Sequence, residues 1–179
     1  MSTLSSILVR DSTEGDVPAI HAIYSHHVLH GLASFEETPP DVAEMAHRRA
    51  EIVKRALPHL VATRDGVIIG YAYVGPFRPR SAYRYTLEDS IYVSPGAQRL
   101  GVGRRLLAEL LHRSSAAGYR QMVAVIGDSA NHASIGLHAA LGFAQVGCLR
   151  SVGFKFGRWV DSVLMERALG SGDTTLPAG

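Results

Sequence analysis

The sequence has little of several features that mark whole classes of protein. Cys148 is its one cysteine, so no internal disulfide and no cysteine-rich zinc site can form. The net charge is only +2, which excludes a polybasic protein that binds nucleic acid mainly by neutralising phosphates. No run approaches the ~20 apolar residues of a transmembrane helix, and the N-terminus lacks the basic and apolar segments of a signal peptide. These absences predict a cytoplasmic protein with no nucleic-acid partner and no membrane partner.

What is present describes a folded domain. Hydrophobic residues make up 46% of the 179 positions and charged residues 19%, a balance typical of globular proteins rather than of disordered chains. The length suits one domain with a substantial core. We expect this domain over residues 1–169 and a flexible tail over residues 170–179.

The spacing of apolar residues predicts the order of helices and strands. A period near 3.6 residues indicates helices at 15–29, 41–55, 102–117 and 131–141. Runs of β-forming residues indicate strands at 6–10, 60–63, 67–74, 83–93, 122–126, 146–152 and 154–165, the last two joined near Gly153. Strands and helices do not alternate regularly, so the fold class is mixed α/β without a doubly wound parallel sheet.

A glycine-rich turn connects the strand at 83–93 to the helix at 102–117. The free N–H groups and the dipole at a helix N-terminus attract anions. Gly101 and Gly103 have no side chain to block an approaching phosphate. Three arginines add positive charge: Arg99, Arg104 and Arg105. The turn therefore predicts a pyrophosphate site; the plainer alternative is a helix start with two incidental glycines.

Three anion-binding patterns compete for this turn. The Walker pattern needs Gly-Lys-Ser/Thr, and no lysine stands here. The dinucleotide fingerprint needs a third glycine where Leu106 stands, yet Asp128 lies about where that pattern places its ribose-binding acid, so this alternative stays open. The segment 98–103, QRLGVG, fits Gln/Arg-x-x-Gly-x-Gly/Ala in full. In this it resembles the pyrophosphate loop of the GNAT acetyltransferases.

A second segment carries the same resemblance. Asn131 opens a helix after the next strand, and that helix ends in Leu-Gly-Phe at 141–143, as in the GNAT superfamily. With both motifs in order, the resemblance spans about residues 6 to 168. It implies a single GNAT-like domain with a central, mixed, mostly antiparallel sheet flanked by helices. It also implies acetyl-CoA as co-substrate.

A narrower resemblance points to the phosphinothricin and methionine sulfoximine N-acetyltransferases. It rests on Phe35-Glu36, on the loop 77–83, on the segment 88–93 and on His138. It implies a small amine acceptor that is similar to an amino acid, and a homodimer.

Carried over by position, the wider resemblance assigns the cofactor site. The backbone of Tyr92, Val93 and Ser94 is expected to pair with the pantetheine arm like an added strand. Asn131 and Ser134 are expected beside the arm, although Asn131 also suits a plain helix cap. The pyrophosphate is expected on six consecutive residues: Arg99, Leu100, Gly101, Val102, Gly103 and Arg104.

Strand alternation supplies an independent argument for the chemistry. One face of the strand at 83–93 is polar throughout and carries Arg84, Thr86, Glu88, Ser90 and Tyr92. An amine must be neutral to attack a thioester, and a carboxylate can take its proton directly or through one water. Glu88 is therefore the candidate base. The alternative is a structural ion pair between Glu88 and Arg84.

Arginines near this strand are candidates for binding the acceptor. Arg78, Arg80 and Arg84 can grip carboxylate, phosphinate or sulfonyl-like oxygens by fork geometry. For Arg78 and Arg80 the alternative is an ordinary exposed arginine. The narrower resemblance completes the acceptor-binding set with Phe35, Glu36, Tyr83 and Thr86.

Histidines raise two further questions. His138 stands where many GNAT enzymes have a tyrosine that protonates the departing thiolate, so it is the second catalytic candidate, with helix packing as the alternative. His26 and His30 lie one helical turn apart, a spacing that metal ligands use. No third ligand is evident, so we expect a solvated helix end there and no metal site.

Together these observations predict an acetyl-CoA-dependent N-acetyltransferase. The acetyl group is expected to pass directly to a small, amino-acid-like acceptor, without a covalent enzyme intermediate. Three alternatives stay open: another small amine such as an aminoglycoside or polyamine, a protein N-terminus, and a non-catalytic acyl-CoA sensor.

Overall fold

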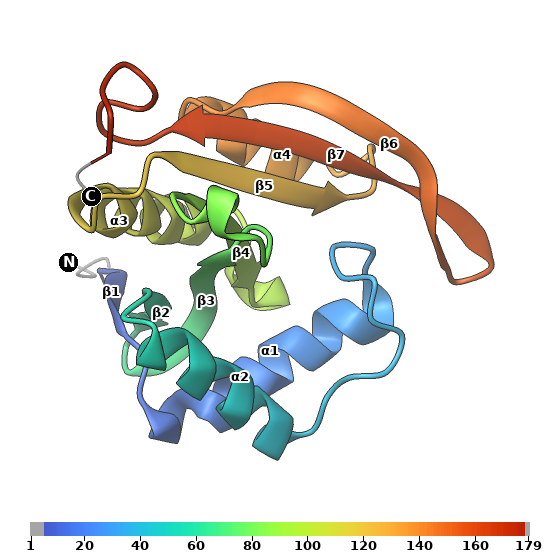
Figure 1. Ribbon diagram of the computed structural model, residues 1–179. Helices are drawn as coiled ribbons and strands as arrows, with labels where there is room; N and C mark the ends of the chain where they lie inside the picture. Colours follow the sequence, from blue (N-terminus) through green and yellow to red (C-terminus); the bar gives the residue numbers. More distant parts are fainter. Residues whose placement is uncertain (1–5, 178–179) are drawn as a thin grey trace.

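One sheet of seven strands carries helices on both faces, as the computed structural model of residues 6–177 shows (Figure 1). The strands are β1 (Leu8–Asp11), β2 (His59–Arg64), β3 (Val67–Pro76), β4 (Thr86–Val93), β5 (Gln121–Gly127), β6 (Ala144–Lys155) and β7 (Arg158–Ala168). The helices are α1 (Val17–His30), α2 (Val42–Lys54), α3 (Val102–Ala116) and α4 (His132–Ala140). Among residues 6–177, none of the helices is both long and apolar enough to span a bilayer.

The sheet has the order β1-β2-β3-β4-β5-β7-β6. Only the β4–β5 pair is parallel among the pairings of the described residues. The mixed, mostly antiparallel sheet is thus confirmed. The single parallel pair lies at its centre, where the chain crosses over through α3 between β4 and β5.

The two faces of the sheet have separate cores. On one face, α3 packs its leucines, such as Leu106 and Leu110, against Leu60, Val74 and Leu87 of the strands. On the other, α1 and α2 pack Ile20, Val28 and Met45 against Val61 and Tyr71. Side chains alternate along β4, so its successive residues face these two different environments.

The residues at the helix ends form the caps that the sequence predicts. The side chains of Asp41 and Asn131 accept hydrogen bonds from the N–H groups three residues on, at 2.8 and 3.2 Å, and so cap α2 and α4. Gly118 and Gly142 follow α3 and α4 with φ of 87° and 86°, the left-handed conformation that favours glycine after a helix.

Two connections between strands differ from the prediction. The strand expected from residue 83 begins at Thr86, because Ser81–Tyr83 forms a short 3-10 turn. The hairpin expected near Gly153 turns instead at Phe156 and Gly157, whose φ values are 52° and 72°. Gly153 lies inside β6, where a Cβ would stand 2.6 Å from the ring of Phe35. Its glycine reflects a close approach of another segment rather than a turn.

The C-terminal segment lies against Arg120. The guanidinium of Arg120 donates hydrogen bonds to Ser171, to Thr175 and to the carbonyls of Gly172 and Leu176. The flexibility of the tail at 170–179 stays a prediction, and residues 178–179 lie outside the described residues.

Candidate active site

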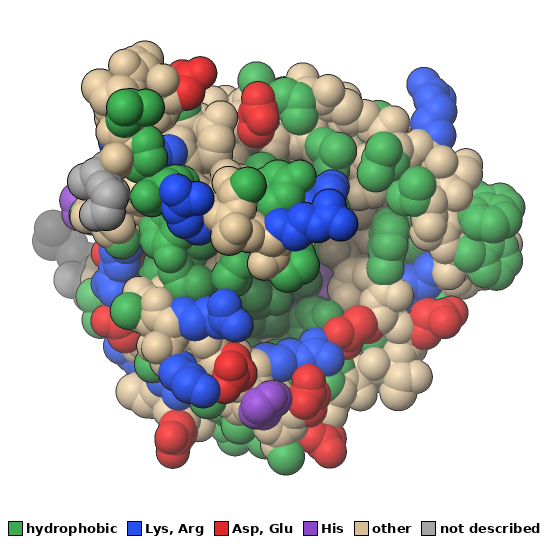
Figure 2. Space-filling view, viewed as in Figure 1, with side chains coloured by type: hydrophobic (Ala, Val, Ile, Leu, Met, Phe, Trp, Pro, Cys, Tyr) green, Lys and Arg blue, Asp and Glu red, His purple; other side chains and the backbone are tan. Residues whose placement is uncertain are grey.

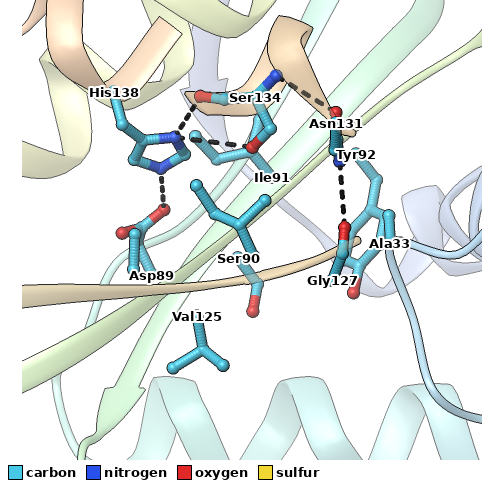
Figure 3. Close-up of a pocket in the computed structure, with 12 residues that line it drawn as sticks. Ala33, Asp89, Ser90, Ile91, Tyr92, Val125, Gly127, Asn131, Ser134 and His138 are labelled. Carbon is cyan, nitrogen blue, oxygen red and sulfur yellow. Dashed lines mark hydrogen bonds and ion pairs between the residues drawn. The ribbon is translucent and has the colours of Figure 1, made fainter. Parts of the chain in front are cut away.

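The central feature is an opening where β4 and β5 part. The two strands pair from Thr86 with Gln121 to Asp89 with Ala124. Beyond this point the described register contains no further β4–β5 pair, and residues 90–93 separate from residues 125–127. A cavity of about 60 Å³ lies between them, lined from both strands, α4 and the loop after α1 (Figure 3).

The backbone of β4 directs hydrogen-bonding groups into this opening. The N–H of Ser94 donates to the carbonyl of Ile69 on β3 at 2.9 Å. Because successive residues of a strand point their backbone groups to opposite sides, Val93 and Ile91 point theirs away from β3 and toward the opening. Of the three residues expected to bind the arm, Val93 therefore has the fitting backbone direction, whereas Tyr92 and Ser94 face β3. The carbonyl of Val93 also accepts a hydrogen bond from His27 Nε2 at 2.9 Å.

The glycine-rich turn has the geometry of an anion site. Arg99 and Gly101 have φ values of 63° and 79°, so the chain turns sharply just before α3. The first hydrogen bond of this helix is donated by Arg105 to the carbonyl of Gly101, which leaves the N–H groups of residues 102–104 directed outward. The side chains of Arg99 and Arg104 are exposed beside them. Gly103 serves a further purpose, because a Cβ there would lie 3.0 Å from Leu137 of α4.

A hydrogen-bonded chain joins α4 to the floor of the opening (Figure 3). Asn131 Nδ2 donates to the carbonyl of Gly127 at 3.4 Å while its Oδ1 caps Ser134. His138 Nδ1 donates to the carbonyl of Ser134 at 2.8 Å, and His138 Nε2 lies 3.0 Å from Asp89 Oδ2. The side chains of His138 and Asp89 are 4% and 2% exposed, so this is a buried pair.

The pair holds a proton beside the cavity. A carbonyl oxygen cannot donate, so His138 Nδ1 carries one proton, and the contact between His138 Nε2 and Asp89 Oδ2 holds a second one. Burial alone would lower the pKa of His138, but the hydrogen bond and charge of Asp89, with the bond to Ser134, together raise it. Asp89 was missed as a site residue, although a carboxylate between Leu87 and Ile91 on the apolar face of β4 signals a buried partner.

The other face of β4 carries the candidate base among tyrosines. Glu88 is half-buried, and burial, followed by the charge of Asp89, raises its pKa. The rings of Tyr71 and Tyr92 stack at 5.3 Å, and Tyr73 is hydrogen-bonded to Ser90. Burial raises the pKa of all three tyrosines, so their hydroxyls stay protonated. No ion pair joins Glu88 to Arg84 in the described part of the chain.

The loop after α1 borders this face of the opening. Ala33 lines the cavity, and the ring of Phe35 rests on Gly127 and Gly153. Glu36 pairs with Arg48 of α2 at 2.7 Å. Sequence reasoning missed Arg48, because its spacing from Glu44 is that of an ordinary exposed helix pair. Figure 2 shows the hollow on this side of the molecule, with hydrophobic side chains in its floor and charges of both signs on its rim.

The predicted arginine group lies apart from the cavity. Arg78, Arg80 and Arg84 surround a groove of about 280 Å³ beside the start of β4, together with Tyr83 and Thr86. Arg84 lies over the ring of Tyr85 at 4.7 Å and donates to the carbonyl of Ser81. Among residues 6–177, none lines both this groove and the cavity between β4 and β5. The expected acceptor-binding residues are thus divided between two places.

Three histidines of α1 are grouped at its C-terminal end. His26 and His30 have ring centroids 4.8 Å apart, but within residues 6–177 no three His, Cys, Asp or Glu side chains are grouped to hold a metal ion. The notable member is the neighbouring His27, whose bond to Val93 ties α1 to the edge of the opening.

This arrangement has close counterparts among known proteins. Residues 20–143 match the acetyltransferase (GNAT) family. The chain is 59% identical over 169 residues to a phosphinothricin N-acetyltransferase of Alcaligenes faecalis, covering 94% of this chain and 86% of that protein. It is 41% identical over 162 residues to an L-methionine sulfoximine/L-methionine sulfone acetyltransferase of Pseudomonas aeruginosa, covering 90% and 94%. A GNAT superfamily phosphinothricin acetyltransferase from Sinorhizobium meliloti, crystallised in complex with AcCoA, has a TM-score of 0.94 at 48% identity, covering 96% and 93%.

Proposed function

The chain belongs to the GNAT acetyltransferase family. We propose that it transfers an acetyl group from acetyl-CoA to the amino group of a small, amino-acid-like acceptor. Phosphinothricin and methionine sulfoximine are acceptors of this kind. The observation that carries the proposal is the opening between β4 and β5. A helix N-terminus suited to a pyrophosphate follows β4, and the partly buried carboxylate of Glu88 lies on β4 next to Asp89, which lines the cavity.

The residues present fit acetyl-CoA. The outward N–H groups of residues 102–104, with Arg99 and Arg104, suit the pyrophosphate. The backbone of Val93 and the side chains of Asn131 and Ser134 suit the pantetheine arm, because they border the parted strands. When bound there, acetyl-CoA supplies an activated acetyl thioester.

The chain's own groups then perform three tasks. Glu88 takes the proton of the acceptor ammonium, directly or through one water, so that the amine can attack. The N–H of Val93 donates a hydrogen bond to the oxygen on which negative charge develops. The His138–Asp89 pair keeps a proton beside the opening for the departing thiolate. No side chain forms a covalent intermediate in this scheme.

Arg78, Arg80 and Arg84 surround a separate groove beside the start of β4, and they are proposed to receive the acidic end of an acceptor that extends there from Glu88. This proposal rests on their exposure around one groove and on the fork geometry of the guanidinium. The change Arg84→Ala is expected to raise the acceptor KM while the acetyl-CoA KM stays nearly constant. An unchanged acceptor KM would remove Arg84 from the acceptor site.

The experiment that tests the function is a thiol-release assay over a panel of amines. Methionine sulfoximine and phosphinothricin should give a kcat/KM at least about tenfold higher than spermidine or kanamycin, because a charge-assisted bond to the acidic end is worth that much. A preference for the polyamines, for the aminoglycoside or for a peptide N-terminus would replace the acceptor class. Binding of acetyl-CoA in titration calorimetry, without thiol release from any amine, would indicate a sensor.

We further propose that two copies of the chain pair through the β6–β7 hairpin. We also propose a cytoplasmic location, because a reducing compartment suits the unpaired Cys148. Strand β6 is the last strand of the sheet, and the hairpin exposes a group of apolar side chains: Val146, Leu149, Val152, Phe154, Phe156 and Trp159. Exposed apolar side chains gathered on one hairpin suit a two-fold pair, because both copies can cover them at once. Light scattering should give twice the mass of 19.3 kDa, and Trp159→Lys should lower it. A monomeric wild-type protein would contradict this.

A further inference from the structure

A buried lysine holds the loop that borders the acceptor side of the opening. Lys155, near the end of β6, is only 1% exposed. Its Nζ donates hydrogen bonds to the carbonyl of Gly31 at 3.0 Å and to the carbonyl of Ser34 at 2.7 Å. A lysine is rarely enclosed in this way unless it is paired, because removing its charge from water is costly. Two backbone carbonyls, one on each side of a two-residue span, provide that pairing.

The span between the two carbonyls forms the wall of the opening. Leu32 and Ala33 lie between Gly31 and Ser34, and Ala33 lines the cavity. The carbonyl of Leu32 packs so closely on Gly127 of β5 that a Cβ on that glycine would lie 2.2 Å from it. The position of Ala33 is therefore set by Lys155 on one side and by the close contact with Gly127 on the other.

The two hydrogen bonds from Lys155 to the carbonyls of Gly31 and Ser34, called the clamp below, also constrain the two predicted acceptor residues that follow. Ser34 Oγ is hydrogen-bonded to the hydroxyl of Tyr24 at 2.9 Å and accepts from the N–H of Glu36 at 3.2 Å. Phe35 lies against Gly153, two residues before Lys155 on β6. A shift of Ser34 would therefore move Phe35 and Glu36 together.

Charge makes this clamp specific to an ammonium group. Burial lowers the pKa of Lys155, while the nearby carboxylates of Glu37 and Glu36 act in the opposite direction. The ammonium also lies 5.0 Å from the centre of the Phe156 ring. A methionine in its place has nearly the same length but no N–H group, and would leave both carbonyls without their donor.

We propose that Lys155 is a positioning residue for the acceptor: it fixes residues 31–36 over the opening, and thereby the wall that these residues form. This inference rests on the proposed function, because it names a determinant of acceptor binding. Lys155 acts by holding Ala33, Phe35 and Glu36 in place, and it does not contact the reacting atoms.

The test compares the only two lysines of the chain. Lys155→Met is expected to raise the acceptor KM about tenfold, the effect of losing one hydrogen bond to a charged group, with the acetyl-CoA KM within about twofold of wild type. Lys54→Met is the matched control, because Lys54 is 76% exposed and has only a long ion pair with Glu51, at 3.6 Å. A merely structural role would change both KM values or only the melting temperature. Equal effects of the two lysine variants on the acceptor KM would overturn the inference.

A second perturbation reaches the same loop without removing a charge. Gly153→Ala places a Cβ 2.6 Å from the Phe35 ring and should also raise the acceptor KM selectively. It keeps the test decisive if Lys155→Met does not fold. An unchanged acceptor KM in Gly153→Ala would count against the clamp.

A measurement without catalysis separates the clamp from the proposed function. In reductive methylation followed by mass spectrometry, Lys54 should be modified rapidly and Lys155 slowly, and Gly153→Ala should speed modification of Lys155. Equal rates at both lysines in the wild type would contradict the clamp, even if no amine in the panel were acetylated. Absence of acetylation with a protected Lys155 would instead count against the proposed function alone.

Discussion

The two sides of the opening between β4 and β5 are built in different ways. On the α3–α4 side, binding groups come from two continuous segments, the turn at 98–104 and the helix that begins after Asn131. On the α1–α2 side, the groups lie on separate elements: Glu88 is on β4 and Glu36 is in a loop, which Arg48 on α2 and Lys155 on β6 hold in place. A site for a fixed cofactor can use consecutive backbone N–H groups, whereas an acceptor site gains its shape from side chains brought together by packing.

Glu88→Gln should have the largest effect among changes that separate the acceptor side from the cofactor side, because it removes the proposed base from the acceptor side. The kcat near neutral pH should fall about 100- to 10,000-fold, the usual contribution of a general base, and recover partly at higher pH, where free amine is abundant. Acetyl-CoA affinity, measured by titration calorimetry, should stay unchanged. In the wild type, kcat/KM should fall as pH drops through the raised pKa of Glu88, where the carboxylate becomes protonated. A variant with the wild-type rate throughout would place the base elsewhere.

Gly101→Val tests the cofactor side. A β-branched residue is strained at φ of 79°, so the turn should distort and the acetyl-CoA KM should rise roughly tenfold or more, the value of one charge-assisted bond to the pyrophosphate. The acceptor KM should change little. Gly96→Ala is the control, because Gly96 lacks the left-handed φ of Gly101 and a Cβ there meets nothing within 4 Å. If the control and Gly101→Val raised the acetyl-CoA KM alike, the turn would not be the pyrophosphate site.

The same division explains what could be predicted from the sequence. The sheet, the helix caps at Asp41 and Asn131 and the glycine turn follow from local patterns, because backbone conformation there depends on a few neighbouring residues. Gly153 was misread as a turn, because its contact partner Phe35 lies more than a hundred positions away. Arg48 and Lys155 were missed for the same reason: nothing in their own segments marks the loop that they hold.

Asp89→Asn tests how much the buried pair of Asp89 and His138 contributes to stability. Asp89 Oδ1 is buried without a hydrogen-bond partner among residues 6–177, so an amide nitrogen there would be unpaired, and the free energy of unfolding should fall by about 1–3 kcal/mol. Asp128→Asn, in an exposed pair with Arg158, is the control with little expected effect.

The pH dependence of stability gives the pair a second readout. The pKa of His138 is raised in the folded state, so the stability from the pair is full below its unfolded value of about 6.5 and is lost as pH rises through the higher folded value. Melting temperatures across this range should show that loss in the wild type and not in Asp89→Asn. The same slope in both proteins would mean that another group titrates.

Arg48→Ala should have the smallest effect on stability and a selective effect on the acceptor. Its ion pair with Glu36 is partly exposed, so its removal should cost at most about 1 kcal/mol. Glu36 would lose its anchor, and the acceptor KM should rise severalfold. Glu44→Ala is the control, because it removes the other partner of Arg48 but leaves the pair with Glu36. If both changes raised the acceptor KM equally, the ion pair of Arg48 with Glu36 would not be what positions the acceptor.

The most direct test of the division between the two sides is the pair of Michaelis constants, for acetyl-CoA and for methionine sulfoximine, in Gly101→Val and in Arg48→Ala. Gly101→Val should raise only the acetyl-CoA constant, and Arg48→Ala only the acceptor constant. If each variant raised both constants, or if both variants raised the same one, the opening would not have a cofactor side at α3–α4 and an acceptor side at α1–α2.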